Sequence, residues 1–139
     1  MAMGVWAAQT AAQIGEEKFI AMLRDTTSEL ARKGMARRNV PKRGLATFTA
    51  GMRKMPPLYR HALVAEIPED TPQVFEYRVS RCLWAKTFRE EDAGALGYAM
   101  VCSPDLAVAS AFSPNLKLTR TKTLMQGHEH CHFRYTMES

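Results

Sequence analysis

The C-terminal stretch LKLTRTKTLMQGHEHCHFRYTM, residues 116–137, decides the fold class of this chain. Apolar and polar side chains alternate on both sides of Gln126-Gly127. Alternation with a period of two is typical of a strand that buries one face. The Gln126-Gly127 pair supplies the turn between the two halves. The stretch therefore predicts an antiparallel hairpin.

A third strand is predicted further upstream, over residues 74–84. Its odd positions are mostly apolar, with Arg81 as the exception: Phe75, Tyr77, Val79 and Leu83. The preceding EDTP, residues 69–72, reads as a turn. Residues 58–67 read either as a short helix or as a fourth strand, so the size of the sheet stays open.

The rest of the chain has helical patterns. A long helix is predicted from about Val5 to Lys33, with Gly15 as its weak point and Gly34 as its C-cap. Further helices are predicted over residues 45–55, 86–100 and 104–112. The last one starts at Ser103-Pro104-Asp105, which reads as a serine cap, a proline at the first position and an acid in the first turn.

These elements together predict an α+β fold, in which N-terminal helices pack on a small antiparallel sheet that ends in a C-terminal hairpin. The chain has 139 residues, which suits a single domain over residues 1–139. Within it, residues 1–67 are expected to be mostly helical. Residues 68–139 are expected to form the strand, the two helices and the hairpin.

The positive charge of the chain is local. Nineteen Lys and Arg against fourteen Asp and Glu give a net charge of +5, but residues 30–60 hold nine basic residues and no acidic one. Only Phe48 and Tyr59 in that segment offer rings for stacking on bases, and no nucleic-acid-binding motif is present. We expect no nucleic-acid partner. The segment suits an acidic partner instead, and we expect a homo-oligomer formed through the N-terminal helices.

The cysteine count and the N-terminus predict a cytoplasmic protein without a membrane span. Three cysteines are an odd number, which favours reduced thiols over a disulfide framework. No Lys or Arg precedes Lys18, so a basic segment of a secretory signal is missing. No run of about 18 apolar residues occurs.

Histidines cluster at the start of the last strand. A strand there places His128, His130 and His132 on one face, where three imidazoles with an open fourth position suit Zn²⁺. The alternative is that they form a solvated, hydrogen-bonding row, since positions i, i+2 and i+4 span too far to converge easily. We expect no cofactor, with zinc as the alternative.

Cys102 and Asp105 lie where a helix is predicted to start. Unpaired amides and the helix dipole lower the pKa of a thiol at that position, which favours a reactive thiolate. Asp105 reads either as a general base or as an acid that only complements the dipole. Cys131 shares its strand face with Phe133 and Tyr135, as a core cysteine does.

Arg120 and Lys122 are predicted to project from one strand face. There they bind a substrate carboxylate or, alternatively, protect an exposed sheet edge. The chain has no phosphate-binding glycine loop, dinucleotide fingerprint, HExxH or GxSxG. The common nucleotide-dependent, zincin and α/β-hydrolase classes are therefore excluded.

The residues from 74 to 136 carry a family resemblance. The spaced set comprises Arg81-Cys82, Phe88, Leu96-Gly97, Cys102-x-x-Asp105, Phe112-x-Pro114, Arg120-Thr121-Lys122-Thr123-Leu124-Met125-x-Gly127 and Cys131-x-Phe133-Arg134-Tyr135. It resembles the L-2-amino-thiazoline-4-carboxylic acid hydrolase family. The GxxxCxF ending is also similar to ligand-binding domains of the vinyl-reductase type. The chain departs from the family pattern at His128 and His132, where an acidic residue is common.

The resemblance implies a hydrolase that opens a small cyclic amidine-like carboxylic acid to an N-carbamoyl amino acid. The candidates for catalysis are Cys102 or an Asp105-activated water as nucleophile, His128 or His132 as proton shuttle, and Cys131. Arg120 is expected to hold the carboxylate, with Lys122, Arg134 and Cys82 as further substrate-binding candidates. The rival hypothesis is a non-catalytic small-molecule-binding module.

Overall fold

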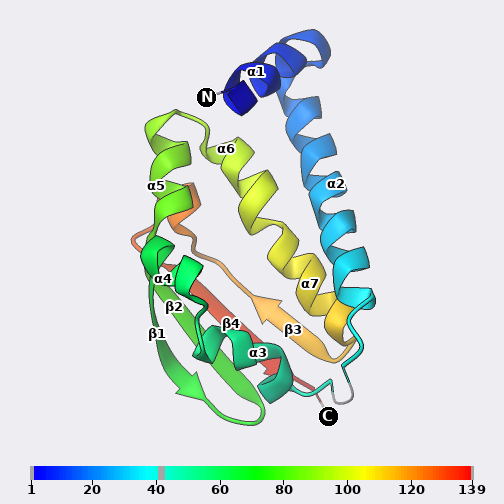
Figure 1. Ribbon diagram of the computed structural model, residues 1–139, viewed down its shortest axis with the longest axis vertical. Coiled ribbons are helices and arrows are strands. Elements are labelled where there is room, and N and C mark those ends of the chain that lie inside the picture. The colour runs from blue at the N-terminus through cyan, green and yellow to red at the C-terminus, as the bar shows by residue number, and fades with distance from the viewer. Residues whose placement is uncertain (1, 41–42, 139) are drawn as a thin grey trace.

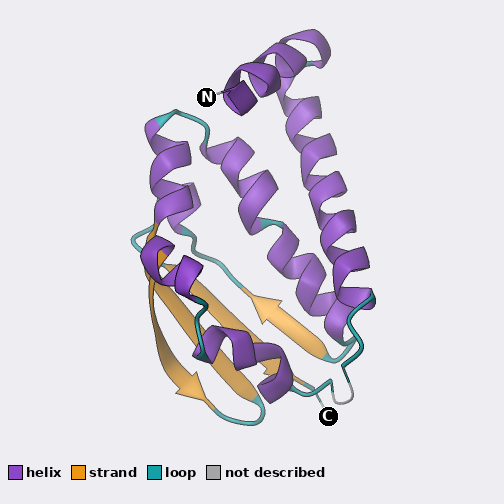
Figure 2. Cartoon of the chain, viewed as in Figure 1, coloured by secondary structure: helices purple, strands orange, loops and turns teal. Residues whose placement is uncertain are grey.

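The computed structural model describes residues 2–40 and 43–138, with the side chains of residues 2–6 and 8 left out. Lys42 of the basic segment therefore lies outside the described residues. The predicted α+β architecture is confirmed: helices pack on a four-stranded antiparallel sheet that closes with the C-terminal strand pair (Figures 1 and 2).

The sheet has the order β1-β2-β4-β3. Its strands are β1 (Leu63–Asp70), β2 (Val74–Cys82), β3 (Leu116–Thr119) and β4 (Cys131–Met137). Both readings of residues 58–67 hold in part, because a short helix, α4 (Pro57–Ala62), runs directly into the edge strand β1. The first strand thus begins at Leu63, inside the part of the chain that was expected to be mostly helical.

The register of the two central strands fixes which side chains enter the core. Phe75 pairs with Tyr135 and Val79 with Cys131, and all four are buried. The intervening residues of both strands point to the opposite face, which carries charged side chains such as Glu76 and Arg134. This is the alternation that the sequence predicts.

The predicted long N-terminal helix is two helices. The chain turns at Gly15 between α1 (Ala2–Ile14) and α2 (Glu16–Ala36), and the φ of Gly15 is 89°. Glycine adopts this conformation without the steric cost that other residues meet. The prediction of a C-cap at Gly34 is wrong, because α2 continues to Ala36 and so buries Met35 in the core.

The middle helices are α3 (Leu45–Arg53) and α5 (Leu83–Glu90), followed by α6 (Gly94–Gly97), a π-helical turn at Tyr98–Cys102 and α7 (Pro104–Phe112). The helix predicted over residues 86–100 is broken by a turn at Asp92, whose φ is 51°. The helix predicted over residues 104–112 is confirmed as α7, with Pro104 and Asp105 in its first turn. The predicted serine cap is wrong, because Ser103 has helical dihedral angles and its side chain makes no capping bond.

The reason is that Pro104 lies inside a continuous helical path. Proline has no N–H to donate and its ring crowds the preceding turn, so an α-helix must adjust there. The wider π turn makes this adjustment, and the Ser103 N–H donates to the Tyr98 carbonyl at 2.8 Å. Figure 1 shows α6 and α7 forming one rod beside α2.

By length and composition alone, the helical rod Gly94–Phe112 is long and apolar enough to cross a membrane. The sequence analysis did not predict this, because the rod is not an unbroken run of apolar residues. Core helices of soluble proteins meet the same criterion. Since α7 packs along α2 and β3, the criterion says little about a membrane here.

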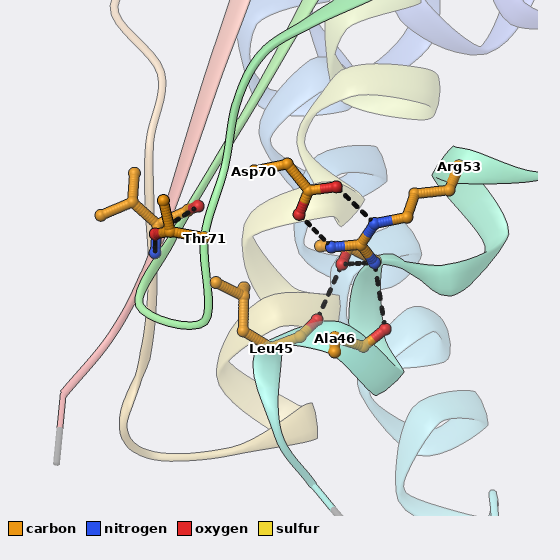
Figure 3. Close-up of polar contacts among 7 residues, drawn as sticks. Leu45, Ala46, Arg53, Asp70 and Thr71 are labelled. Atoms are coloured by element: carbon orange, nitrogen blue, oxygen red, sulfur yellow. Dashed lines mark hydrogen bonds and ion pairs between the residues drawn. The ribbon is translucent and has the colours of Figure 1, made fainter.

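Arg53, one of the basic residues of segment 30–60, has a structural role (Figure 3). Its guanidinium donates from Nε to Asp70 Oδ2 at 2.7 Å, and its Nη2 also binds that carboxylate. Nη1 donates to the Ala46 carbonyl at 3.2 Å, and the group lies 4.9 Å from the centre of the Phe75 ring. Arg53 thereby joins α3 to the turn between β1 and β2.

Candidate functional site

Arg120 follows the last residue of β3 and turns its side chain into the protein, where only 1% of it is exposed. Its Nη1 donates to Asp105 Oδ2 at 2.8 Å. Its Nη2 donates to the Cys102 carbonyl at 2.9 Å and to the Tyr98 hydroxyl at 3.3 Å. Because three polar groups hold it, the guanidinium is fixed in place away from solvent.

Two aromatic rings complete the surroundings of this guanidinium. Its central carbon lies 5.2 Å from the centre of the Phe133 ring and 5.6 Å from that of Tyr98. Cations are attracted to aromatic faces at such distances. Nε of Arg120 is buried and has no hydrogen-bond partner among the described residues. The guanidinium therefore keeps a nitrogen whose N–H donor is unused.

The π turn explains how a helix can offer a backbone carbonyl to Arg120. In the stretch around Pro104 the regular bonding pattern is interrupted, and the Leu106 N–H donates to Ser103 O. The Cys102 carbonyl is thus available to Arg120, and the Ala99 carbonyl accepts from the Thr27 hydroxyl at 2.8 Å. Such π turns occur frequently at functional sites.

Asp105 lies at the opening of this site. Its side chain is 41% exposed, whereas the protein atoms crowded around its other sides raise the pKa of Asp105 to about 6. The positive charge of Arg120 opposes that rise. Asp105 is therefore accessible to solvent and changes its protonation state near neutral pH.

Cys102 has the opposite character from the one expected at a helix start. Burial raises the pKa of its thiol to about 12, and the nearby Arg120 only partly offsets this effect. The helix path runs through Ser103 without a free N-terminus, so no unpaired amides favour a thiolate at Cys102. The expectation of a lowered pKa is therefore wrong, and the free protein holds Cys102 as a neutral thiol.

The other two cysteines are in the same part of the core, and both accept backbone hydrogen bonds. The Leu124 N–H donates to Cys131 Sγ at 3.1 Å, and burial raises the pKa of Cys131. The Ala85 N–H donates to Cys82 Sγ at 3.5 Å, which caps α5. Each sulfur therefore has a structural contact of its own.

The structure sets His128 apart from the other two histidines, whose ring centres lie 6.3 Å from each other. β4 begins only at Cys131, so His128 and His130 precede the strand. The ring of His128 contacts the backbone of Thr123 at 3.1 Å, while His132 lies 3.5 Å from Glu76 on the outer face of the sheet. Within the described residues, no group of three or more His, Cys, Asp and Glu side chains is arranged to hold a metal ion.

Lys122 and Arg134 also lie apart from the Arg120 site. β3 ends at Thr119, so the prediction that Arg120 and Lys122 project from one strand face is wrong: Arg120 is buried and Lys122 is exposed. Arg134 binds Glu76 and, at 3.2 Å, Glu69 on the outer face of the sheet.

Of the predicted site residues, the structure brings Cys102, Asp105 and Arg120 together, with Cys131 and Cys82 in the same core. It adds Tyr98 and Phe133, which the sequence analysis did not assign to a site. The available signal for Tyr98 was Pro104, since a proline inside a helical pattern indicates a distorted turn before it.

The fold and this site define an α+β protein with a buried cation behind an exposed acid. The family model of L-2-amino-thiazoline-4-carboxylic acid hydrolase matches residues 1–135, so the chain belongs to that family. This confirms the resemblance and extends it to the N-terminal helices. No curated protein matches the chain.

Among solved structures, the fold is similar to the phenol-responsive sensory domain of the transcription activator PoxR, solved with phenol. The TM-score is 0.52 at 12% sequence identity, over 98% of this chain and 73% of that one. At this identity the similarity concerns the fold alone.

Proposed function

We propose that this protein hydrolyses a small ring that carries a carboxylate and a C=N carbon, as the name of its family indicates. The observation that supports this most strongly is the Arg120–Asp105 pair. A buried guanidinium with an unused N–H suits a substrate carboxylate. A carboxyl group with a pKa of about 6 suits general acid–base catalysis near neutral pH.

The same observations favour water over Cys102 as the nucleophile. A thiol attacks as its thiolate, and burial raises the pKa of Cys102 to about 12. Asp105 is mostly ionised above pH 6 and is exposed enough to contact water. Asp105 is therefore the better base, and Cys102 lines the site.

The reaction on a thiazoline ring then balances as follows. Asp105 takes one proton from water while the water oxygen bonds to the C=N carbon, and the other proton moves through solvent from that oxygen to the ring nitrogen. The bond from this carbon to sulfur breaks, and Asp105 returns its proton to the sulfur. The product is one open-chain molecule that carries an N-carbamoyl group and a free thiol. His132 and Arg134 take no part, because they lie on the other face of the sheet.

The test is thiol release from L-2-aminothiazoline-4-carboxylate, followed with a thiol-reactive dye. We expect Asp105→Asn to abolish turnover and Arg120→Lys to raise KM. Cys102→Ser should keep most of the activity, and Asp92→Asn, a change in an exposed turn, serves as the matched control. Full activity in Asp105→Asn would contradict the role of Asp105. Complete loss in a folded Cys102→Ser would contradict water as the nucleophile.

A second candidate function is non-catalytic binding of a small molecule. It is favoured by the rings of Tyr98 and Phe133 beside Arg120 and by the fold of a sensory domain that was solved with phenol. Under this alternative, the thiazoline acid raises the melting temperature of the protein while no thiol is released.

A further inference from the structure

Asp105 and Arg120 each have one oppositely charged partner among the described residues, and that partner is the other member of the pair. Among the described residues, Asp105 is the sole carboxylate in contact with Arg120, and Arg120 is the sole cation in contact with Asp105. A buried guanidinium without an anion nearby is strongly disfavoured. Whatever displaces Asp105 must therefore bring a negative charge of its own.

The two partners differ in access. Asp105 is 41% exposed, and Arg120 is 1% exposed. An anion that arrives from solvent therefore meets Asp105 before it meets Arg120. Once Asp105 moves away, Nη1 of Arg120 becomes free in addition to the unpaired Nε. Nη1 is then available to the carboxylate of a ligand, which takes the place of the Asp105 carboxylate there.

From this geometry we infer that the substrate carboxylate replaces Asp105 as the counterion of Arg120, and that the displaced Asp105 takes up one proton in the same step. This inference rests on the proposed function and specifies the order of its events. Asp105 then enters the reaction already protonated beside the bound ring. It gives this proton to the ring nitrogen, which replaces the transfer through solvent in the proposed reaction. The ionised Asp105 then takes one proton from water and passes it to the sulfur as before, and the second water proton leaves to solvent.

The titratable groups around Asp105 keep their charge state near pH 7.5, so Asp105 is the group that takes up the proton when a ligand binds. The groups that interact with it are Arg120, Cys102 on the π turn, and Cys131 and Tyr135 on β4, while Tyr98 contacts Arg120. Burial raises the pKa of Cys102, Cys131 and Tyr135, so these stay neutral at pH 7 to 8. The charged residues that α2 presents toward α7 line a separate groove: Arg24, Asp25 and Arg32.

The sign of the pH effect follows from the exchange. In the free protein the pKa of Asp105 is about 6. In the complex Asp105 has lost its cation and gained an anionic neighbour, and both changes raise its pKa further. Between these two pKa values binding takes up about one proton, so the Kd rises by about tenfold for each unit of pH.

The experiment uses 2-aminothiazole-4-carboxylate, an aromatic analogue that cannot be hydrolysed, so the result does not depend on turnover. Calorimetric titrations at pH 7.5 in phosphate and in Tris give the number of protons taken up. We expect about one proton per ligand for the wild type and for Asp92→Asn. Asp105→Asn should bind the ligand with no proton uptake and with a Kd independent of pH.

A second ligand, 2-aminothiazoline, lacks the carboxylate and should bind far more weakly and without proton uptake. Wild-type binding of the acid with no proton uptake would overturn the inference, as would equal affinity for the two ligands or binding of neither. The same uptake in a folded Asp105→Asn would also overturn it. If proton uptake is found but no thiazoline is hydrolysed, the exchange stands and the proposed hydrolysis fails.

Discussion

Each face of the sheet holds an arginine that is paired with a carboxylate, but the two environments differ. On the core face, Arg120 is 1% exposed and has one acidic partner, Asp105. On the outer face, Arg134 is 40% exposed and has two, Glu69 and Glu76. Water can replace a lost partner of Arg134, whereas Arg120 has no second carboxylate partner among the described residues to replace Asp105.

The pKa values of the two acids show the same difference with opposite signs. Crowding by the protein raises the pKa of Asp105 despite the adjacent Arg120. The hydrogen bond from Arg134 lowers the pKa of Glu76, with a further contribution from His132. The two salt bridges therefore shift the pKa of their acids in opposite directions, because desolvation outweighs the attraction of the arginine at Asp105 but not at Glu76.

The largest expected effect comes from removing each arginine in turn. Arg120→Ala leaves a cavity between Tyr98 and Phe133 and strands the Cys102 carbonyl, and we expect it to lower the free energy of unfolding by about 3 kcal/mol. Arg134→Ala removes a side chain that is 40% exposed, and we expect a loss much smaller than that caused by Arg120→Ala. Urea denaturation at pH 7.5 measures both. Equal losses would show that the two faces do not differ.

The second effect is a pair of opposite pH dependences. Since the pKa of Asp105 is raised on folding, its contribution to stability is fully present below pH 4 and is lost as the pH rises to about 6. Over that range the wild type should lose stability relative to Asp105→Asn.

Glu76 should do the reverse. Its pKa is lowered on folding, so its contribution is present above the unfolded pKa, near 4.5, and is lost as the pH falls. The wild type should therefore gain stability relative to Glu76→Gln as the pH rises from 3 to 5. Thermal melting across pH 3 to 7 tests both slopes, and slopes of the same sign would refute the assignment.

The smallest expected effect sharpens the description of the core face. Tyr98→Phe removes only the hydroxyl that accepts from Arg120 at 3.3 Å and keeps the ring beside the cation. We expect a loss of about 1 kcal/mol in the free energy of unfolding. Tyr59→Phe is the matched control, because Tyr59 is 43% exposed on α4. A larger loss in the control would mean that the Tyr98 hydroxyl contributes nothing specific.

The strands could be predicted from the sequence because their alternation is a local property. Val74–Cys82 and Cys131–Met137 form the strands that their pattern indicates. The break at Gly15 and the edge strand β1 were less visible. The residues on both sides of Gly15 have a helical pattern, so the sequence does not show that the helix breaks there. β1 alternates only partly between buried and exposed positions, because Glu66, Ile67 and Pro68 are all exposed.

The site could be predicted in part. Cys102, Asp105 and Arg120 were all predicted as site residues, and the structure brings them together. The local reasons given for Cys102 and Arg120 fail, because the π turn leads directly into α7 beside Cys102 and β3 ends at Thr119 before Arg120. Only the tertiary fold shows that Arg120 reaches the π turn, 18 residues away along the chain from Cys102.

The π turn makes part of the site insensitive to side-chain identity. Arg120 contacts the main-chain oxygen of residue 102 and not its sulfur. Any residue at position 102 that keeps the turn also keeps this bond, whereas a change at Pro104 alters the carbonyl itself. The position of the guanidinium is therefore set through the backbone and does not depend on the thiol.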